Sequence, residues 1–576
     1  MHEIITLQFG HYSNFVGTHY WNAQDAYFTY NDSPNSPEPE IIHDIHFRTG
    51  LSQKGIETYT PRVIIYDLKG GFGQIKKMNK LYEDTTTDES DQLWNWKVET
   101  YSQMPYPKNE FLRNLEEEEE KAFSSEPIND INDNEIDFEE KNFNLNETVK
   151  TWSDFNKIYY HPQSIYSIPE FQYDDDFSPF DVFTYGKNVF SKNKNEDENS
   201  FEKNFRFFAE ECDSIQGFQV IADTIDGFGG CASNFLEQLR EEYPKNSILS
   251  FGITESPKLV SSPERANYFK KQILNSSLST IQLTELSSLF IPLNIPPFPL
   301  GNEPFLKFTQ PNFGLPYHSS GILSAAIETA TLPFRSKRDF IYMSDFVNRL
   351  TWRGNTKIGI LDLIFPFPIS EFGEIHFQNI VSNNIKNGIS IDLSMSQVQR
   401  IKQIQRIQQV QEQIYPPTIF GQSVVIRGIP NIFNSVSRRD NPKKSTDITT
   451  DIFQQYKSLK SGMNFFYSTN LAYPIPNSFP KIFKNLNLNG YVDEFRGFTN
   501  SSSSNSVKSI PTLSHLTIST QVKELLKLYT NLLQKINFNQ FPEFQDGIEG
   551  LSHDEFIETK ELLYNLCGTL ENDHNI

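Results

Sequence analysis

The sequence predicts an α/β fold with a buried parallel sheet, and three observations along one stretch of the chain support that prediction. The short apolar run Phe218 to Ala222 is typical of a strand buried in such a sheet. Asp223 to Gly230 is rich in glycine and predicts a turn. Cys231 to Tyr243 then carries apolar residues at helical spacing up to Pro244, and Ile248 to Ile253 is the next predicted strand.

A glycine-bearing turn between a strand and a helix is where α/β proteins place a phosphate. Small residues there let backbone N–H groups and the helix N-terminus approach an anion. Glycine serves a tight turn more often than a ligand, however. Asp226 also lies inside the predicted turn, where its carboxylate would repel phosphate unless a metal or another cation intervened. The turn alone therefore indicates a nucleotide only weakly.

The composition limits the class of protein. With 576 residues the chain is long enough for two or three domains, and 49 Phe supply apolar material for a core. A formal net charge of -22 and a pI near 5.0 argue against direct nucleic-acid binding, which needs a basic face. Cys212, Cys231 and Cys567 are widely spaced and match no metal or disulfide framework, which is typical of an intracellular, reduced protein.

Nothing in the sequence predicts a membrane span or a cleavable leader. No run of about 18 apolar residues appears, so we expect no transmembrane segment, and peripheral membrane association stays open. The chain opens with Met1-His2-Glu3 and enters the apolar run Ile4 to Leu7, without the Arg-rich amphipathic stretch of a mitochondrial presequence. We expect the protein to act from the cytosolic side.

The opening segment predicts a strand over Ile4 to Phe9, a turn at Gly10 and a helix that begins near Ser13 or Asn14. It resembles the opening of the tubulins position for position, at Glu3, Ile4, Gln8, Gly10, Asn14, Gly17 and Trp21. The glycine-bearing stretch also resembles tubulins, in Gln216-Gly217-Phe218-Gln219, Arg240-Glu241-Glu242-Tyr243-Pro244 and Ser256-Pro257-Lys258. The tubulin signature GGGTGSG falls on residues 225–231 or one residue earlier, and its first two glycines are absent.

The resemblance implies a guanine-nucleotide site, here degenerate, and its candidate residues have structural alternatives. The candidates are Gly10, His11, Tyr12, Asn14, Asp67, Gly227, Gly229 and Gly230. His11, Tyr12 and Ser13 stand where tubulins carry Gln-Cys-Gly. Tyr12 could stack on a base or plug an empty pocket, and we favour the plug. His11 has no visible partner for base catalysis, and turn geometry explains the retained glycines equally well.

Other positions that the resemblance assigns to nucleotide chemistry are changed. Asp67 ends a predicted strand, but Lys69 replaces the acid that tubulins place near magnesium. Lys187 lies where tubulins have a γ-phosphate loop that this sequence does not reproduce, and a lone Lys is more often solvated. Ser319 to Ser324, which we align with the hydrolysis-promoting helix of polymerising tubulins, holds no Asp or Glu. We therefore expect no metal site, no catalytic residue and no required cofactor, while GTP binding stays open.

The chain divides into four predicted regions. Residues 1–73 and 177–290 form a tubulin-like, Rossmann-type nucleotide domain, and 74–176 form an acidic, partly disordered insertion. Residues 305–500 form a second, intermediate α/β domain, and 507–576 form a C-terminal helical region.

One helix is predicted over Ser319 to Thr331, and three more are predicted outside the first domain. Two lie in the C-terminal region, around Gln521 to Ile536 and Ser552 to Leu570. The third is amphipathic, over Asp392 to Ile414, and either packs on its own domain or binds a partner.

A tubulin-like opening, a long acidic insertion and an eroded phosphate loop together resemble the Misato family, particularly its fungal members. The resemblance implies a tubulin-like protein that distributes mitochondria and supports inheritance of mitochondrial DNA, on the mitochondrial outer surface and in the cytoplasm. We expect a non-enzymatic protein whose partners are proteins of the mitochondrial surface or of cytoskeletal or chaperonin machinery. Two alternatives stay open: a GTP-binding or GTP-hydrolysing protein that assembles as tubulin and FtsZ do, and an acidic adaptor that works through its insertion.

Overall fold

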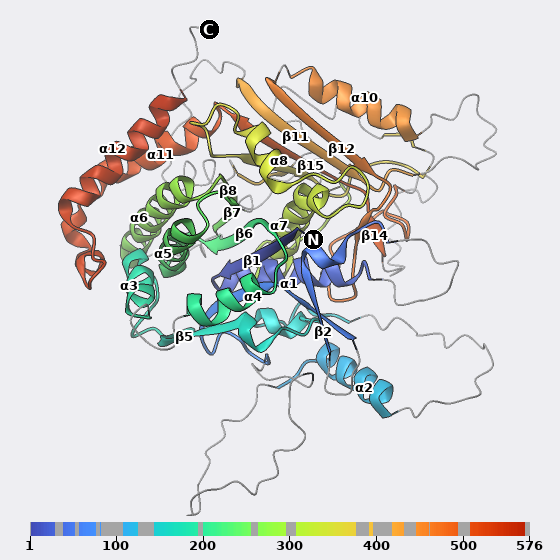
Figure 1. The fold of residues 1–576 in the computed structure, drawn as a ribbon, viewed down its shortest axis with the longest axis horizontal. Helices are drawn as coiled ribbons and strands as arrows, with labels where there is room; N and C mark the ends of the chain where they lie inside the picture. Colours follow the sequence, from blue (N-terminus) through green and yellow to red (C-terminus); the bar gives the residue numbers. More distant parts are fainter. Residues whose placement is uncertain are drawn as a thin grey trace, which may run out of the picture.

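Figure 1 shows a computed structural model of the chain. It describes residues 2–28, 39–51, 57–75, 81, 107–124, 143–193, 200–254, 263–294, 307–371, 373–375, 391–394, 417–430, 445–459, 461–492 and 507–570.

Six parallel strands form the larger sheet, in the order β5-β4-β1-β6-β7-β8. They are β1 (Glu3–Phe9), β4 (Val63–Lys69), β5 (Ile165–Gln172), β6 (Ile215–Asp223), β7 (Ser247–Thr254) and β8 (Leu289–Asn294). The inner strands are buried on both faces, which explains their continuous apolar runs in the sequence. The predicted α/β fold with a parallel sheet is confirmed.

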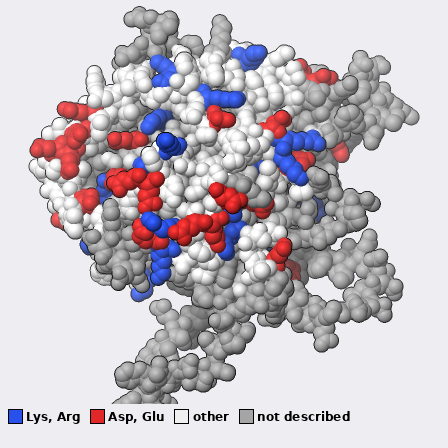
Figure 2. Space-filling model, in the orientation of Figure 1, with Lys and Arg blue, Asp and Glu red and all other residues white. Residues whose placement is uncertain are grey.

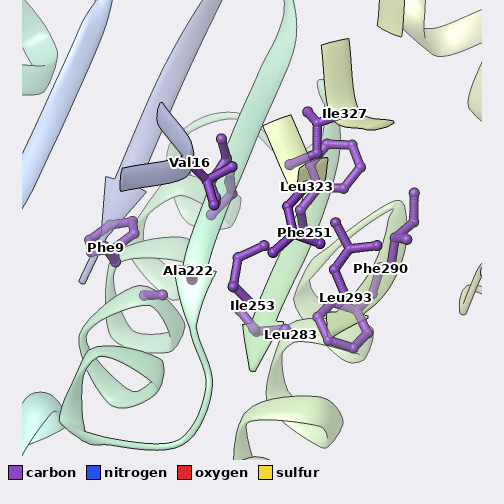
Figure 3. Packing of buried hydrophobic residues seen from close by; sticks show 14 of the residues in the cluster. Phe9, Val16, Ala222, Phe251, Ile253, Leu283, Phe290, Leu293, Leu323 and Ile327 are labelled. Carbon is purple, nitrogen blue, oxygen red and sulfur yellow. The ribbon is translucent and has the colours of Figure 1, made fainter. Parts of the chain in front are cut away.

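Helices cover both faces of this sheet (Figure 1). One face carries α3 (Phe183–Asn193), α5 (Gly227–Glu242) and α6 (Pro263–Leu286), and the other carries α1 (His11–Asp25), α7 (Pro316–Thr331) and α8 (Met343–Leu350). Figure 3 shows part of the core between them, where Val16 of α1 and Leu323 of α7 lie over the strands that carry Ala222 and Phe251.

A second, mixed sheet of five strands has the order β10-β9-β15-β11-β12. Its strands are β9 (Ile360–Ile364), β10 (Ile391–Asp392), β11 (Ile419–Arg427), β12 (Met463–Thr469) and β15 (Thr512–Ser519). Because α8 contacts strands of both sheets and α7 contacts α1 and the second sheet, these two helices form a layer between the sheets. α10 (Ser445–Lys457) covers the outer face of the second sheet with Ile448 and Ile452.

The C-terminal helices α11 (Val522–Lys535) and α12 (His553–Thr569) pack on each other and on α6. The helical region predicted over 507–576 is wrong at its start, because β15 lies within it and pairs with β9 and β11 in the second sheet. Between them, the short η9 (Pro542–Gln545) contacts α3. Figure 2 shows acidic side chains gathered at the left edge, where Figure 1 places α12. The helices of the described part of the chain include none long and apolar enough to cross a bilayer.

The remaining elements are short or peripheral. They include the hairpin β2 (Phe47–Leu51) and β3 (Glu57–Pro61), α2 (Glu110–Ser124), η2 (Trp152–Phe155), α4 (Arg206–Glu210), and the strand pair β13 (Tyr473–Pro474) and β14 (Ser509–Ile510).

The structure corrects the predicted insertion over 74–176. β5, within that range, pairs with β4 and forms one edge of the larger sheet. Trp152 and Phe155 are fully buried, and the acidic run Glu116 to Glu120 belongs to helix α2 rather than to an unstructured segment. A run of charge predicts solvation locally, but the apolar side chains on either side of it anchor the chain to the sheet. Residues 143–176 therefore belong to the first domain.

Three further boundaries differ from the sequence prediction. α1 begins at His11 and α5 at Gly227, both earlier than predicted, because aspartate side chains cap them in ways described below. β8 continues to Asn294, so the predicted domain boundary at residue 290 falls inside a strand. The amphipathic helix predicted over Asp392 to Ile414 lies outside the described residues, apart from positions 392–394.

Candidate nucleotide site

The larger sheet has its ligand-binding position between β1 and β6. From β1 the chain crosses to β4 and β5 on one side, while β6, β7 and β8 extend the sheet on the other. In open α/β sheets this change of direction leaves a crevice at the carboxyl ends of the two central strands. The N-termini of α1 and α5, which follow β1 and β6, both face this end of the sheet.

Asp223, the last residue of β6, places its carboxylate at the N-terminus of α1. Oδ2 accepts a hydrogen bond from the Tyr12 backbone N–H at 3.0 Å, and Oδ1 accepts from the Ser13 N–H at 2.9 Å and from the Ser13 hydroxyl at 2.6 Å. These two amides are among the unpaired donors that a helix N-terminus offers to an anion. A carboxylate of the chain itself therefore occupies the position of the expected phosphate.

Gly10 is required by this arrangement. Its φ of 113° lies in the region that favours glycine, and a Cβ there would come within 2.2 Å of Asp223 Oδ2. Gly10 thus lets the Asp223 carboxylate approach the helix, and α1 begins directly after it.

Asp226 caps the second helix. Its Oδ1 accepts from the Phe228 backbone N–H at 2.9 Å, so α5 begins at Gly227 and not after the glycines. Both helix N-termini at the crevice therefore carry a negative charge that belongs to the chain.

The three glycines of α5 are explained by helix packing. A Cβ at Gly230 would lie 1.9 Å from the carbonyl oxygen of Phe183 in α3, and one at Gly227 would lie 2.7 Å from the Phe180 ring. A Cβ at Gly229 would meet the Ser279 hydroxyl of α6 at 2.1 Å. These glycines let α3 and α6 approach α5 closely, so they are no evidence of a phosphate loop.

Asp67, which the tubulin resemblance places near magnesium, is fully buried and accepts hydrogen bonds on both carboxylate oxygens. Its Oδ2 lies 3.1 Å from Asn14 Nδ2, 2.8 Å from the Trp152 indole nitrogen and 3.1 Å from His11 Nδ1, while Oδ1 accepts from the Leu68 N–H. Lys69, two residues on, is exposed. The carboxylate that the tubulin resemblance places near magnesium instead joins α1 to η2.

Aromatic side chains fill the space around these residues. The Tyr12 ring is 6 % exposed and its hydroxyl donates to Ser319 Oγ of α7 at 2.7 Å. The His11 ring lies 4.1 Å, centre to centre, from that of Tyr173. Structure thus brings Gly10, His11, Tyr12, Asn14 and Asp67 together around one end of α1, whereas Gly227, Gly229 and Gly230 lie in a helix interface.

Lys187 is partly exposed and is engaged by an acid of a neighbouring helix. It lies in α3, where its ammonium forms an ion pair with Glu237 of α5 at 3.2 Å. It thereby reinforces the same α3–α5 contact that the glycines permit.

Sequence reasoning missed Asp223, Trp152 and Glu328. Asp223 was assigned only to a turn, although an acid at a strand end beside a helix N-terminus is a recognisable cap.

Glu328 lies in α7, four residues beyond the range aligned with the tubulin catalytic helix, and its side chain is fully buried. It pairs with Arg335 at 2.5 Å and with Arg427 of β11. Burial alone would raise the pKa of Glu328, but Arg427 and Arg335 hold it below the ordinary value.

The residues at the crevice do not fit a guanine nucleotide with magnesium. Two carboxylates stand where phosphates would bind, the Asp67 carboxylate is engaged by side chains of α1 and η2, and a lysine replaces the second acid. Among the described residues, no group of three or more His, Cys, Asp or Glu side chains could hold a metal ion.

Comparison with known proteins identifies the family. Residues 2–117 match the Misato segment II tubulin-like domain, and residues 143–336 match a tubulin domain. Protein dml1 of Aspergillus clavatus is 32 % identical over 83 % of this chain and 86 % of its own length. The chain belongs to the Misato family. The family extends to mammals: protein misato homolog 1 of Homo sapiens is 28 % identical over 98 % of this chain and 97 % of its own length. Protein dml-1 of Neurospora crassa is 28 % identical over 84 % and 86 %.

The tubulin domain match begins at residue 143, which agrees with the inclusion of η2 and β5 in the first domain. The Misato segment II match ends at residue 117, inside α2. The tubulin-like fold expected from the sequence is therefore confirmed for this member of the Misato family.

Proposed function

We propose that this Misato-family chain is a non-enzymatic tubulin-like protein that partitions mitochondria and supports inheritance of mitochondrial DNA through protein interactions. The cellular role follows from what the family resemblance implies. The non-enzymatic character is supported by one observation above all, the Asp223 carboxylate bound to the Tyr12 and Ser13 amides. The protein works on the mitochondrial outer surface and in the cytoplasm, with partners in the surface, cytoskeletal or chaperonin machinery.

At the N-terminus of α1, the free energy of the hydrogen bonds favours the Asp223 carboxylate over an incoming phosphate. Each hydrogen bond to a charged group contributes about 1.5–3 kcal/mol, and Asp223 accepts three in a buried position. A phosphate that left Asp223 in place would meet a like charge, at a cost of about 4 kcal/mol for unit charges 4 Å apart near a protein surface. One that displaced Asp223 would leave a buried carboxylate without donors.

The nucleotide part of the proposal is tested with the purified full chain. We expect no guanine nucleotide in a denatured extract, no GTP hydrolysis above buffer, and the same melting temperature with and without millimolar GTP and Mg²⁺. A ligand at about 100 times its Kd would add about 2.7 kcal/mol, which a melt detects. Stoichiometric guanine nucleotide or a clear rise in melting temperature would favour the GTP-binding alternative.

The cellular part needs a separate test. In cells depleted of the endogenous protein, the full chain should restore mitochondrial distribution and transmission of mitochondrial DNA to daughter cells. A tagged chain should be recovered with mitochondria and released by alkaline carbonate, as a peripheral protein is. Normal mitochondrial inheritance after depletion would refute the cellular role and leave the conclusion on nucleotide binding intact.

A further inference from the structure

The two large sheets have four outer strands, and β12 differs from the other three in its composition. β5 carries Pro169 and Glu170, β8 carries Pro292, and β10 has two residues, one of them Asp392. Proline, charge and short length are the usual protections of a sheet edge against pairing with another chain. β12, with the sequence MNFFYST, has seven residues and neither proline nor charge.

The outer edge of β12 is open in the described part of the chain, where β12 pairs with β11 alone. Its side chains alternate between two helices. Phe465 packs edge to face on Phe346 of α8, with ring centres 5.6 Å apart, and Phe466 stacks on Phe453 of α10 at 4.9 Å. Both rings are only partly buried, so an added strand would cover their remaining surface.

Exposed apolar surface continues at the start of the strand. Met463 is 40 % exposed and Trp352, whose indole donates to the Phe420 carbonyl, is 55 % exposed. The open edge of β12, its two phenylalanine rings and these two side chains together form a surface suited to the addition of another strand. In strand addition, main-chain hydrogen bonds supply the affinity and side chains fix the register.

The strand is complementary to itself. In an antiparallel pair centred on Phe466, that residue lies opposite its own copy, and Phe465 lies opposite Tyr467. Exposed polar Asn464 lies opposite exposed polar Ser468, and Met463 lies opposite Thr469. Aromatic residues thus meet aromatic residues at the centre and polar residues meet polar ones beside them, which are pairings that stabilise antiparallel strands, while the outermost pair joins Met463 to Thr469. No residue of β12 is itself charged, so charge within the strand does not oppose this pairing. A carboxylate contacts the end of the strand, where the Thr469 hydroxyl donates to Glu40 at 3.1 Å.

We propose that β12 is a homodimerisation strand, at which two copies of this chain join about a twofold axis through Phe466. The second sheets of the two copies then form one continuous sheet. The interface is isologous, so it closes at the dimer and does not extend into a filament.

Analytical ultracentrifugation of the full chain tests this directly. We expect the wild type to sediment as a concentration-dependent dimer in the micromolar range. The variant carrying Asn464→Asp and Ser468→Asp places carboxylates opposite carboxylates at both ends of the pair, and should weaken dimerisation on the order of tenfold or more. Asn464→Asp keeps the Oδ1 acceptor that Gln422 and Ser461 use, so the fold should be unaffected.

A control double variant and a charge-reversal rescue distinguish pairing of the β12 strands from a general effect of added charge on dimerisation. Asn539→Asp with Asn565→Asp adds the same two charges at exposed positions of the C-terminal helical region and should leave the dimer intact. Mixing the β12 double variant with a chain carrying Ser468→Lys should restore association, because a lysine now faces an aspartate. Hydrogen exchange of the wild type should show β12 amides more protected at high than at low protein concentration.

A wild type that stays monomeric at tens of micromolar would overturn the proposal. So would a dimer that the β12 double variant leaves unchanged, because another surface would then hold it. β12 amides whose exchange does not depend on concentration would count equally against it.

Discussion

Glu328 of α7 and Arg427 of β11 form an ion pair in which both side chains are fully buried. Arg427 also donates to the Tyr27 hydroxyl at 2.7 Å and to the carbonyls of Leu471 and Ala472, while Arg335 donates to Glu328 Oε1. The pair therefore joins the helix layer to the second sheet and to the end of α1. It lies buried where α7 meets β11.

Glu328→Gln should be strongly destabilising, because it leaves two guanidinium groups buried without an anion. Breaking a buried pair by removing one partner costs about 3–5 kcal/mol. Urea unfolding measures this, and Glu558→Gln on the exposed face of α12 serves as the control, expected within about 0.5 kcal/mol of wild type. Equal effects of the two substitutions would show that the buried pair contributes nothing.

Asp223→Ala should lower the free energy of unfolding by about 1–3 kcal/mol, because the Tyr12 and Ser13 amides lose their buried acceptor. The same variant should be stabilised by millimolar inorganic phosphate, since the α1 N-terminus then offers its amides to an anion. Thermal melts with phosphate and with chloride at equal ionic strength measure both effects. A variant as indifferent to phosphate as the wild type would argue against Asp223 as a substitute for a bound anion.

Gly230→Ala should cost about 1–3 kcal/mol or more, because its methyl group would meet the Phe183 carbonyl oxygen and push α3 away from α5. Gly568 in α12 is the matched control: no atom lies within 4 Å of its added Cβ, so Gly568→Ala should stabilise the helix by about 0.5–1 kcal/mol. Chemical denaturation of both variants tests the packing explanation of the glycines. A neutral Gly230→Ala would reject it.

Stability should fall as the pH drops below about 6.5, because buried histidines are neutral in the folded chain. Burial lowers the pKa of His19 to about 3, against an upward contribution from its hydrogen bond with the Tyr317 carbonyl. Burial also lowers the pKa of His515 to about 3 and that of His318 to about 4. Their contribution is complete above the unfolded pKa of 6.5 and is lost as the pH falls toward the folded values.

The size of this effect is about 1.4 kcal/mol per pH unit for each such group between pH 6 and pH 5. Urea unfolding at a series of pH values gives the slope, and His19→Gln should reduce it by nearly one group's share. Carboxylates with ordinary pKa values titrate below the window from pH 6.5 to pH 5. Burial and the neighbouring Asp392 raise the pKa of Asp362 well above its ordinary value, so this carboxyl contributes with the opposite sign and the three histidines outnumber it. A flat profile across this window would contradict the buried, neutral state.

Local patterns in the sequence predicted much of the fold. Apolar runs such as Phe218 to Ala222 located the strands, since a strand buried on both faces is apolar along its whole length. Helical periodicity located α7, α11 and α12 to within a few residues. The charge run in α2 was misleading, because local charge says nothing about the buried Trp152 and Phe155 that follow.

Local residue patterns were enough to predict the α/β class, the positions of most elements, the tubulin resemblance and the loss of two phosphate-loop glycines. The side chains that stand in place of the nucleotide chemistry became visible in the folded chain alone. Asp223 meets Tyr12 across more than two hundred residues because β1 and β6 are neighbours in the sheet, and Glu328 meets Arg427 because α7 lies beside β11. Hydrogen bonds and ion pairs depend on distance in space, which the linear order of a chain does not contain.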